Sequence, residues 1–338
     1  MNAASQAPRR CIVPLVGRAK SIAVGRLLSI GLVGVVLVVG LIVYASSRSA
    51  GSVAEAPGRG VSPLPVPARV QSNVLLAAGD IATCGSSGAA ATARIIARSQ
   101  GVVVALGDEA YPDGSRANFT QCYARAWGRF RARTRPTPGN HEYHQTDAAP
   151  YFAYFGGAAG VAGRGYYSYT VGGWHIVSLN SNCSHIGGCD RGSAEERWLR
   201  ADLAAHPARC TLAYWHHPRF SSGTAHGSDS EMEPIWQDLY ADGADVVLSG
   251  HEHNYERFAP QTASGRRDSR RGIREFVVGT GGKNHYDDFE RPIANSEIRS
   301  AETYGILKLT LGRAGYRWQF IPVAGGIFRD AGSGRCHR

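Results

Sequence analysis

Hydrophobic residues in this chain occur in short, continuous runs separated by longer stretches of mixed polarity. The runs Val74–Ala78 and Val102–Leu106 are entirely apolar, and Ala89–Ser99 lies between them. Short apolar runs of this kind are typical of strands that are buried on both faces, as in an α/β sheet. The first part of the folded region is therefore predicted to be strand, helix and strand.

The same alternation continues towards the C-terminus. Tyr166–Val171 and Trp174–Leu179 are expected to form a hairpin, and Ser193–His206 a helix whose capping box pairs Ser193 with Glu196. The other expected elements are strands at Thr211–Trp215, Val246–Ser249, Glu275–Val278, Ile306–Leu311 and Arg317–Ile321, and helices at Arg116–Arg131, Ala148–Phe155 and Met232–Ala241. This order predicts an α/β fold in four layers, with two mixed β-sheets packed face to face and flanked by helices.

The N-terminal part has a different pattern. Residues 27–45 form an uncharged apolar segment, which follows a basic segment at residues 1–26. Such a segment is long enough to cross a bilayer as a helix, and its basic flank places the N-terminus in the cytoplasm and the rest of the chain outside. Small residues near Ala45 also suit signal-peptide cleavage, so anchor and cleaved signal remain alternatives. Residues 46–70, rich in Pro, Gly and Ser, are expected to be a linker before one domain at residues 71–338.

The formal net charge of +10 is concentrated near the N-terminus. Residues 1–45 contribute +5 and residues 46–70 contribute +2, so subtracting both from +10 leaves +3 for the remaining chain. A nucleic-acid partner is therefore not expected, whereas the mildly basic remainder suits an anionic phosphate substrate.

Six of the seven cysteines follow the apolar segment. They form no CxxC pair, which argues against a zinc ribbon. An even number of cysteines outside the membrane favours three disulfides in an oxidising compartment, with six reduced, buried thiols as the alternative. The expected pairs are Cys183–Cys189, which flank a short glycine-containing loop, Cys84–Cys122 and Cys210–Cys336.

Polar residues suited to metal binding follow several of the apolar runs. Gly250-His251-Glu252-His253 comes directly after Val246–Ser249, and histidines one residue apart project to the same side of an extended segment. Asp80, Asp108 and His216 follow other expected strands. Functional groups in α/β sheets collect beyond the carboxyl ends of strands, so these side chains are expected to meet in one metal cluster.

These motifs, in this order, resemble those of the calcineurin-like metallophosphoesterases. The resemblance rests on Gly79-Asp80, Gly107-Asp108-Glu109-Ala110-Tyr111, Gly139-Asn140-His141-Glu142, His216-His217-Pro218 and Gly250-His251-Glu252-His253. It covers nearly all of residues 73–322. The chain is most similar to the purple acid phosphatase branch, because the first motif lacks the histidine common in the wider superfamily and Tyr111 would replace it.

The resemblance implies two metal ions that share one carboxylate. The implied ligands are Asp80, Asp108, Tyr111 and His253 for one ion, and Asp108, Asn140, His216 and His251 for the other. A phenol becomes a ligand near neutral pH only beside a strongly acidic cation, so Tyr111 favours ferric iron in the first position. Zinc, manganese or ferrous iron would occupy the second position. His217 is a rival to His216, which we prefer because it fits the His-x-Pro spacing.

The implied function is that of an exported phosphatase, in which a metal-bridging hydroxide attacks a phosphomonoester in line. His141 and His226 would bind the phosphate or protonate the leaving group. The alternatives are a phosphodiesterase or nucleotidase with the same cluster, or a catalytically silent surface protein. The expected partner is a small phosphorylated substrate, together with the membrane if residues 27–45 are not cleaved. The catalytic domain at residues 71–338 would then be anchored outside the cell or secreted.

Overall fold

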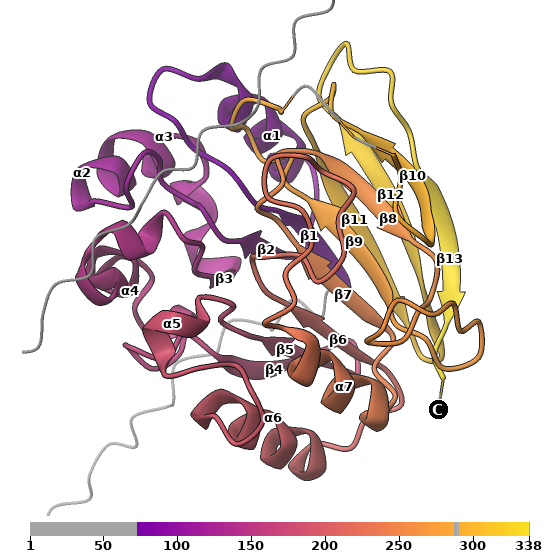
Figure 1. The fold of residues 1–338 in the computed structure, drawn as a ribbon. Helices are drawn as coiled ribbons and strands as arrows, with labels where there is room; N and C mark the ends of the chain where they lie inside the picture. The colour runs from indigo at the N-terminus through magenta and orange to yellow at the C-terminus, as the bar shows by residue number, and fades with distance from the viewer. Residues whose placement is uncertain (1–72, 287–288, 290, 338) are drawn as a thin grey trace, which may run out of the picture. The chain divides into compact units, whose positions relative to one another are not determined.

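The computed structural model describes residues 73–286, 289 and 291–337. Two mixed β-sheets are flanked by helices, so the predicted α/β architecture is confirmed (Figure 1). The predictions for residues 1–26, for the apolar helix at 27–45 and for the linker at 46–70 lie outside the described residues. Within the described part, none of the helices has the length and apolar character needed to cross a membrane.

The first sheet contains six strands. They are β1 (Val74–Ala78), β2 (Val102–Leu106), β3 (Thr134–Thr137), β11 (Gly305–Gly312), β12 (Gly315–Pro322) and β13 (Ala331–Arg335). Their order across the sheet is β13-β12-β11-β1-β2-β3. β1, β2 and β3 are parallel to one another, whereas β11, β12 and β13 add antiparallel strands beside β1.

The second sheet contains seven strands. They are β4 (Tyr167–Val171), β5 (Trp174–Ser178), β6 (Thr211–Tyr214), β7 (Val246–Ser249), β8 (Tyr255–Phe258), β9 (Arg274–Val278) and β10 (Ser296–Ser300). Their order is β10-β8-β9-β7-β6-β5-β4. β5, β6, β7 and β9 form a parallel centre with antiparallel strands at both sides. Both sheets therefore contain a set of parallel strands whose carboxyl ends lie at one edge of the sheet.

Helices cover the outer faces. They are α1 (Ser87–Ala97), α2 (Arg116–Asn118), α3 (Ala124–Ala126), α4 (Ala149–Phe155), α5 (Cys183–Ile186), α6 (Ala194–Ala205) and α7 (Glu233–Asp242). Leu212 of β6 belongs to a buried cluster that also contains Leu309 of the first sheet, while the next residue, Ala213, packs with Leu203 of α6 and Leu239 of α7. Because neighbouring residues of a strand face opposite sides, this alternation separates the core between the sheets from the core under α6 and α7.

The region predicted as one helix over Arg116–Arg131 is helical except at Trp127, but it is not a single regular α-helix. This region begins with α2, continues as a π-helix at Phe119–Tyr123 and α3, and ends as a 3-10 helix at Gly128–Arg133. Phe119, Tyr123 and Trp127 are buried at four-residue spacing. Residues at this spacing share one face of the helical segment, which they bury against the core.

Four strands were not predicted: β3, β8, β10 and β13. Three of them, β3, β10 and β13, are edge strands of their sheets. β3 contains Pro136, and β13 reads Ala-Gly-Ser-Gly-Arg. Edge strands tolerate proline and need no continuous apolar run, because only one side pairs with a neighbour. Hydrophobic pattern alone therefore detects the central strands better than the edges.

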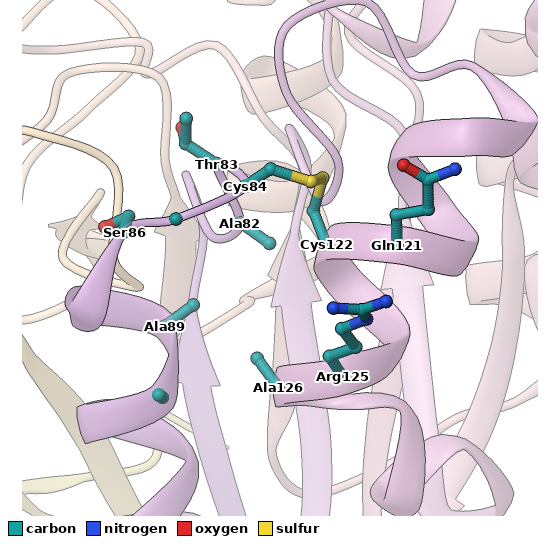
Figure 2. Close-up of a pocket in the computed structure, with 11 residues that line it drawn as sticks. Ala82, Thr83, Cys84, Ser86, Ala89, Gln121, Cys122, Arg125 and Ala126 are labelled. Carbon is teal, nitrogen blue, oxygen red and sulfur yellow. A yellow bond between two sulfur atoms is a disulfide. The ribbon is translucent and has the colours of Figure 1, made fainter.

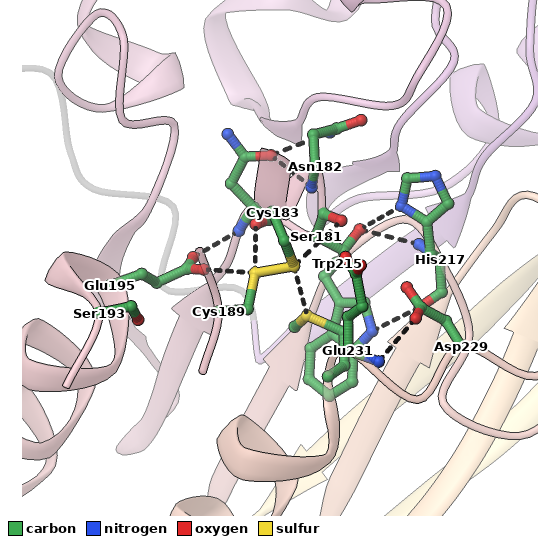
Figure 3. Close-up of a disulfide and its surroundings, with 12 residues drawn as sticks. Ser181, Asn182, Cys183, Cys189, Ser193, Glu195, Trp215, His217, Asp229 and Glu231 are labelled. Carbon is green, nitrogen blue, oxygen red and sulfur yellow. Dashed lines mark hydrogen bonds between the residues drawn. A yellow bond between two sulfur atoms is a disulfide. The ribbon is translucent and has the colours of Figure 1, made fainter. Parts of the chain in front are cut away.

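The structure contains the three expected disulfides, Cys84–Cys122, Cys183–Cys189 and Cys210–Cys336. Cys84–Cys122 joins the loop after β1 to the π-helical turn, beside a pocket lined by Gln121 and Arg125 (Figure 2). Cys183–Cys189 closes the loop that follows β5 (Figure 3). Two of the three bridges therefore fasten loops at the carboxyl ends of strands.

Glu195 should make stability depend on pH. It is fully buried in the first turn of α6, and burial raises its pKa from 4.5 to about 8. Because the pKa is higher in the folded state, this group's contribution is fully present below its unfolded pKa and is lost as the pH rises through the folded value. We expect Glu195→Gln to reduce the fall in unfolding free energy between about pH 5 and about pH 8, as measured by urea denaturation. An unchanged pH dependence would contradict this assignment.

Candidate metal centre

The predicted metal ligands follow the carboxyl ends of strands from both sheets. In chain order they are Asp80 after β1, Asp108 and Tyr111 after β2, Asn140 after β3, His216 after β6, and His251 and His253 after β7. The sheets are joined at this edge, where the Gly79 N–H donates to the Val278 carbonyl at 2.9 Å. The functional ends of the two parallel centres therefore meet at one place, as α/β topology predicts.

Three of these residues have left-handed backbone conformations. The φ angle is 59° at Asp80, 50° at Asp108 and 70° at His251. Positive φ is uncommon outside glycine and costs roughly 1 to 3 kcal/mol per residue, so it persists only where surrounding contacts impose it. Here backbone hydrogen bonds hold the chain, including that from Asp80 N–H to the Gly107 carbonyl at 3.1 Å. The sharp turns direct the side chains of the three residues towards a common centre.

The first group of predicted ligands surrounds the Tyr111 hydroxyl. This oxygen lies 3.0 Å from Asp80 Oδ1, 2.9 Å from Asp108 Oδ2 and 3.1 Å from His253 Nε2. The hydroxyl has one proton for three neighbouring acceptor atoms. His253 Nδ1 lies 2.7 Å from the Asn284 carbonyl, so Nδ1 donates there and the Nε2 lone pair faces the group. A cation would satisfy the remaining lone pairs.

The second group is built around His216. Its Nε2 atom lies 3.2 Å from Asn140 Oδ1 and 3.1 Å from His251 Nδ1. Its Nδ1 atom lies 2.7 Å from the Leu106 carbonyl and donates to it. The imidazole is therefore oriented with Nε2 towards the centre, as the second hydrogen bond of a metal-binding histidine orients its ring.

Asp108 lies between the two groups. Its Oδ2 atom is 2.9 Å from the Tyr111 hydroxyl and 3.4 Å from His216 Nε2. Its Oδ1 atom accepts the backbone N–H of His141 at 2.9 Å, which fixes the orientation of the carboxylate. The structure thus brings the seven predicted ligands together, with Asp108 in the position expected for a shared carboxylate.

The electrostatics of the centre favour positive charge. Burial, and to a lesser extent the Asp108 carboxylate, raises the pKa of Asp80 to about 8. Burial alone would lower the pKa of His216, but Asp108, Asp80 and the Leu106 carbonyl together raise this pKa to about 9. Burial lowers the pKa of His253 to about 3, so this imidazole is neutral and able to coordinate. Two buried carboxylates beside imidazoles form a donor set that fits divalent or trivalent cations, and a cation bound at His216 Nε2 would take the place of the proton held there.

Backbone amides near the ligands are held by Glu142, a residue not predicted to belong to the site. Its buried carboxylate accepts N–H groups from Asp108 and Gly139, both at 2.9 Å, and from Glu109 at 3.0 Å and Ala110 at 3.3 Å. A side chain on Gly139 would collide with the Asp108 carboxylate. Glu142 therefore joins the loops that follow β2 and β3.

The two predicted catalytic histidines contact different ligands, His141 beside Tyr111 and His226 beside His251. His141 Nδ1 is hydrogen bonded to the Pro112 carbonyl, and its Nε2 lies 3.8 Å from Asp108 Oδ2. The exposed His226 ring packs on His251 with centroids 4.0 Å apart, and its backbone N–H donates to Glu252 Oε1 at 2.7 Å. Both imidazoles border the centre, where a substrate would contact them.

Sequence comparison agrees with this geometry. The profile of the calcineurin-like phosphoesterases matches residues 71–255, more than half of the chain, and the matched region contains all seven predicted ligands. The chain belongs to the calcineurin-like phosphoesterase family. Phosphoesterases are hydrolases, and membership in this family indicates the same class of reaction here.

Curated relatives include purple acid phosphatases. Purple acid phosphatase 15 of Arabidopsis thaliana is 31% identical over 199 residues, which are 48% of this chain and 37% of that protein. An uncharacterized protein of Mycobacterium tuberculosis is 30% identical over 213 residues, 49% of this chain and 40% of that protein. The matched part therefore spans less than half the length of either relative.

Solved structures share the fold of this calcineurin-like domain. Purple acid phosphatase PPD1 from yellow lupin seeds has a TM-score of 0.63 at 17% identity, covering 77% of this chain and 53% of that one. GAP50, described as the anchor in the inner membrane complex of Plasmodium, has a TM-score of 0.58 at 13% identity, covering 78% of this chain and 89% of that one. At these identities the likeness concerns the fold alone.

The loop after β9 also borders this phosphoesterase centre, although its glycine-rich sequence indicates only a turn. Lys283 Nζ lies 4.6 Å from the centre of the Tyr111 ring. Tyr286 stacks on His253 with centroids 4.0 Å apart, and its hydroxyl lies 3.3 Å from His226 Nε2. The position of this loop beyond a parallel strand was the signal that could have revealed it.

Proposed function

We propose that this protein is an exported binuclear metallophosphatase that hydrolyses phosphomonoesters. The observation that carries the proposal is the position of Asp108, whose Oδ2 atom lies between the group around Tyr111 and the group around His216. A shared carboxylate holds two cations close enough to clamp one phosphoryl group. Family membership and the purple acid phosphatase relatives support the same reaction.

The donor atoms suggest which cations would bind. The first ion would be ferric iron held by the Tyr111 group, because a phenolate and carboxylates are hard, anionic ligands. The second ion would be zinc, manganese or ferrous iron, with His216, His251 and Asn140 completing the set with Asp108. When bound, the two ions supply an activated water for in-line attack on phosphorus and positive charge for the transition state.

The chain's own residues orient the substrate and transfer the proton. His141 Nδ1 donates to the Pro112 carbonyl, so Nε2 is the atom directed to the substrate. We assign His141 to holding a phosphoryl oxygen and to protonating the leaving-group oxygen. His226 lies beside His251 and Tyr286, and we assign it to binding the substrate there. Both roles place a nitrogen next to the phosphoryl group and not among the metal ligands.

Export is part of the proposal. Three disulfides are consistent with an oxidising compartment, because thiols in the cytosol are kept reduced. Residues 27–45 would act as a membrane anchor or as a signal cleaved near Ala45. Residues 46–70 would link this segment to the catalytic domain at residues 71–338, which would then lie outside the cell.

The reaction class can be tested with matched substrates. The exported protein is expected to hydrolyse 4-nitrophenyl phosphate at least about tenfold faster, in kcat/KM, than bis(4-nitrophenyl) phosphate. Prolonged treatment with a chelator should abolish both rates, and added metal should restore them. A preference for the diester would favour a phosphodiesterase with the same centre. No hydrolysis of either ester after metal addition would favour a catalytically silent binding protein.

A further inference from the structure

His217 lies at the centre but belongs to neither group of predicted ligands. One nitrogen of its ring is within 4.8 Å of a nitrogen of His216 and of a nitrogen of His251. Its ring centroid is 4.4 Å from that of His251, and the side chain is only partly buried. A third imidazole at this distance is either an additional ligand or a group that contacts the substrate.

Hydrogen bonds to Ser181 distinguish these two roles. Ser181 Oγ accepts the backbone N–H of His217 at 2.9 Å and lies 2.7 Å from His217 Nδ1 (Figure 3). Because Ser181 Oγ already accepts the backbone N–H of His217, its own O–H is available to donate to Nδ1. With the hydroxyl donating to Nδ1, the neutral ring has its proton on Nε2.

His216 has the opposite arrangement. Its Nδ1 donates to the Leu106 carbonyl, which leaves the Nε2 lone pair free for a cation. The Nε2 atom of His217 has a proton in place of that lone pair, so it is a hydrogen-bond donor. The hydrogen-bond partner of Nδ1 therefore makes Nε2 a metal ligand in His216 and a hydrogen-bond donor in His217.

The loop that contains Ser181 is well anchored. The Cys183–Cys189 disulfide closes the turn that begins two residues after Ser181 (Figure 3), and the backbone N–H of Asn180 donates to Glu195 Oε1 at 2.7 Å. Asn182 Nδ2 donates to the Pro138 carbonyl at 3.1 Å. Ser181 is 3% exposed, so its hydroxyl has a fixed position relative to His217.

We propose that His217 binds the substrate by donating its Nε2–H to a non-bridging oxygen of the phosphoryl group, and that Ser181 is the positioning residue that holds this tautomer. The inference rests on the proposed phosphatase function. A bound phosphate presents anionic oxygens, which are strong acceptors for an N–H donor. The segment after β5 that precedes the disulfide thereby becomes part of substrate recognition.

The test measures metal content and the binding of inorganic phosphate by calorimetry. His217→Ala should keep two metal ions per chain, as in the wild type, and weaken phosphate binding by at least about tenfold, the effect of one hydrogen bond to a charged group. Ser181→Ala should weaken it less, with the metal content unchanged, and Ser181→Thr should restore it by returning the hydroxyl. His206→Ala, a change to an exposed histidine on the surface following α6, is the matched control.

Two results would overturn the inference. Loss of one metal ion from His217→Ala would make His217 a ligand, and unchanged phosphate affinity in both His217→Ala and Ser181→Ala would make the pair a packing contact only. Ser181→Ala leaves the imidazole in place, so it decides the question if His217→Ala does not fold. A wild-type protein with fewer than two metal ions and no phosphatase activity would instead contradict the proposed function.

Discussion

Asp108→Asn is expected to lower kcat/KM for a phosphomonoester by about a thousandfold or more, equivalent to at least about 4 kcal/mol of transition-state stabilisation. The asparagine side chain has nearly the same shape, but it has no negative charge and its amide nitrogen has no lone pair for a cation. Oδ2 of Asp108 is the atom that lies near both Tyr111 and His216, so the change acts on both metal positions. Steady-state kinetics and metal analysis of the same preparation measure the effect.

The matched control for this variant is Asp190→Asn, which removes a carboxylate from an exposed loop residue. It should retain the activity and metal content of the wild type. Thermal melts should show that both variants are folded. Normal activity together with two bound ions in Asp108→Asn would contradict the assignment of Asp108 as the shared ligand.

Glu142→Gln is expected to lower the free energy of unfolding by about 2 to 4 kcal/mol. Oε2 of Glu142 accepts the N–H groups of Asp108 and Gly139, and Oε1 accepts those of Glu109 and Ala110. In glutamine an NH₂ group replaces one of these oxygens. At either position this NH₂ group would face two buried backbone N–H groups, and each unsatisfied group costs about 1 to 3 kcal/mol. Urea denaturation at neutral pH measures the change, and metal affinity should fall with it because the same amides shape the ligand loops.

Glu302→Gln serves as the control for this experiment, since the side chain of Glu302 is exposed and Glu302 is distant in sequence from Glu142. Its unfolding free energy should differ from the wild type by no more than about 0.5 kcal/mol, as is usual for surface changes. A similarly small effect for Glu142→Gln would mean that the carboxylate does not hold the two loops.

The centre could be predicted from the sequence because its residues follow strands that the hydrophobic pattern reveals. β1, β2 and β7 have the predicted bounds, and Asp80, Asp108 and His251 each follow one of them after a single glycine. Parallel strands place their carboxyl ends at one edge, so motifs far apart in the chain were expected to meet. The irregular region after Arg116 and the edge strands were missed because long-range packing and pairing, not local periodicity, determine them.

The supporting residues could not be predicted in the same way. Glu142 was known only as part of a motif, and its four amide partners depend on how the loops after β2 and β3 approach each other. Ser181 has no sequence signal, because its contact with His217 spans 36 residues. Lys283 and Tyr286 follow a glycine-rich turn whose return to the centre depends on the order of strands in the second sheet.

The most direct test of the two-metal centre is the metal content of the exported protein, measured together with its visible spectrum and compared with that of Tyr111→Phe. We expect two metal ions per chain, one of them iron, and a tyrosinate charge-transfer band that the Tyr111→Phe variant lacks. Two ions without such a band would mean that the first position holds a cation other than ferric iron, and the two-metal assignment would still hold. A protein that binds fewer than two ions under any metal supplied would contradict the account.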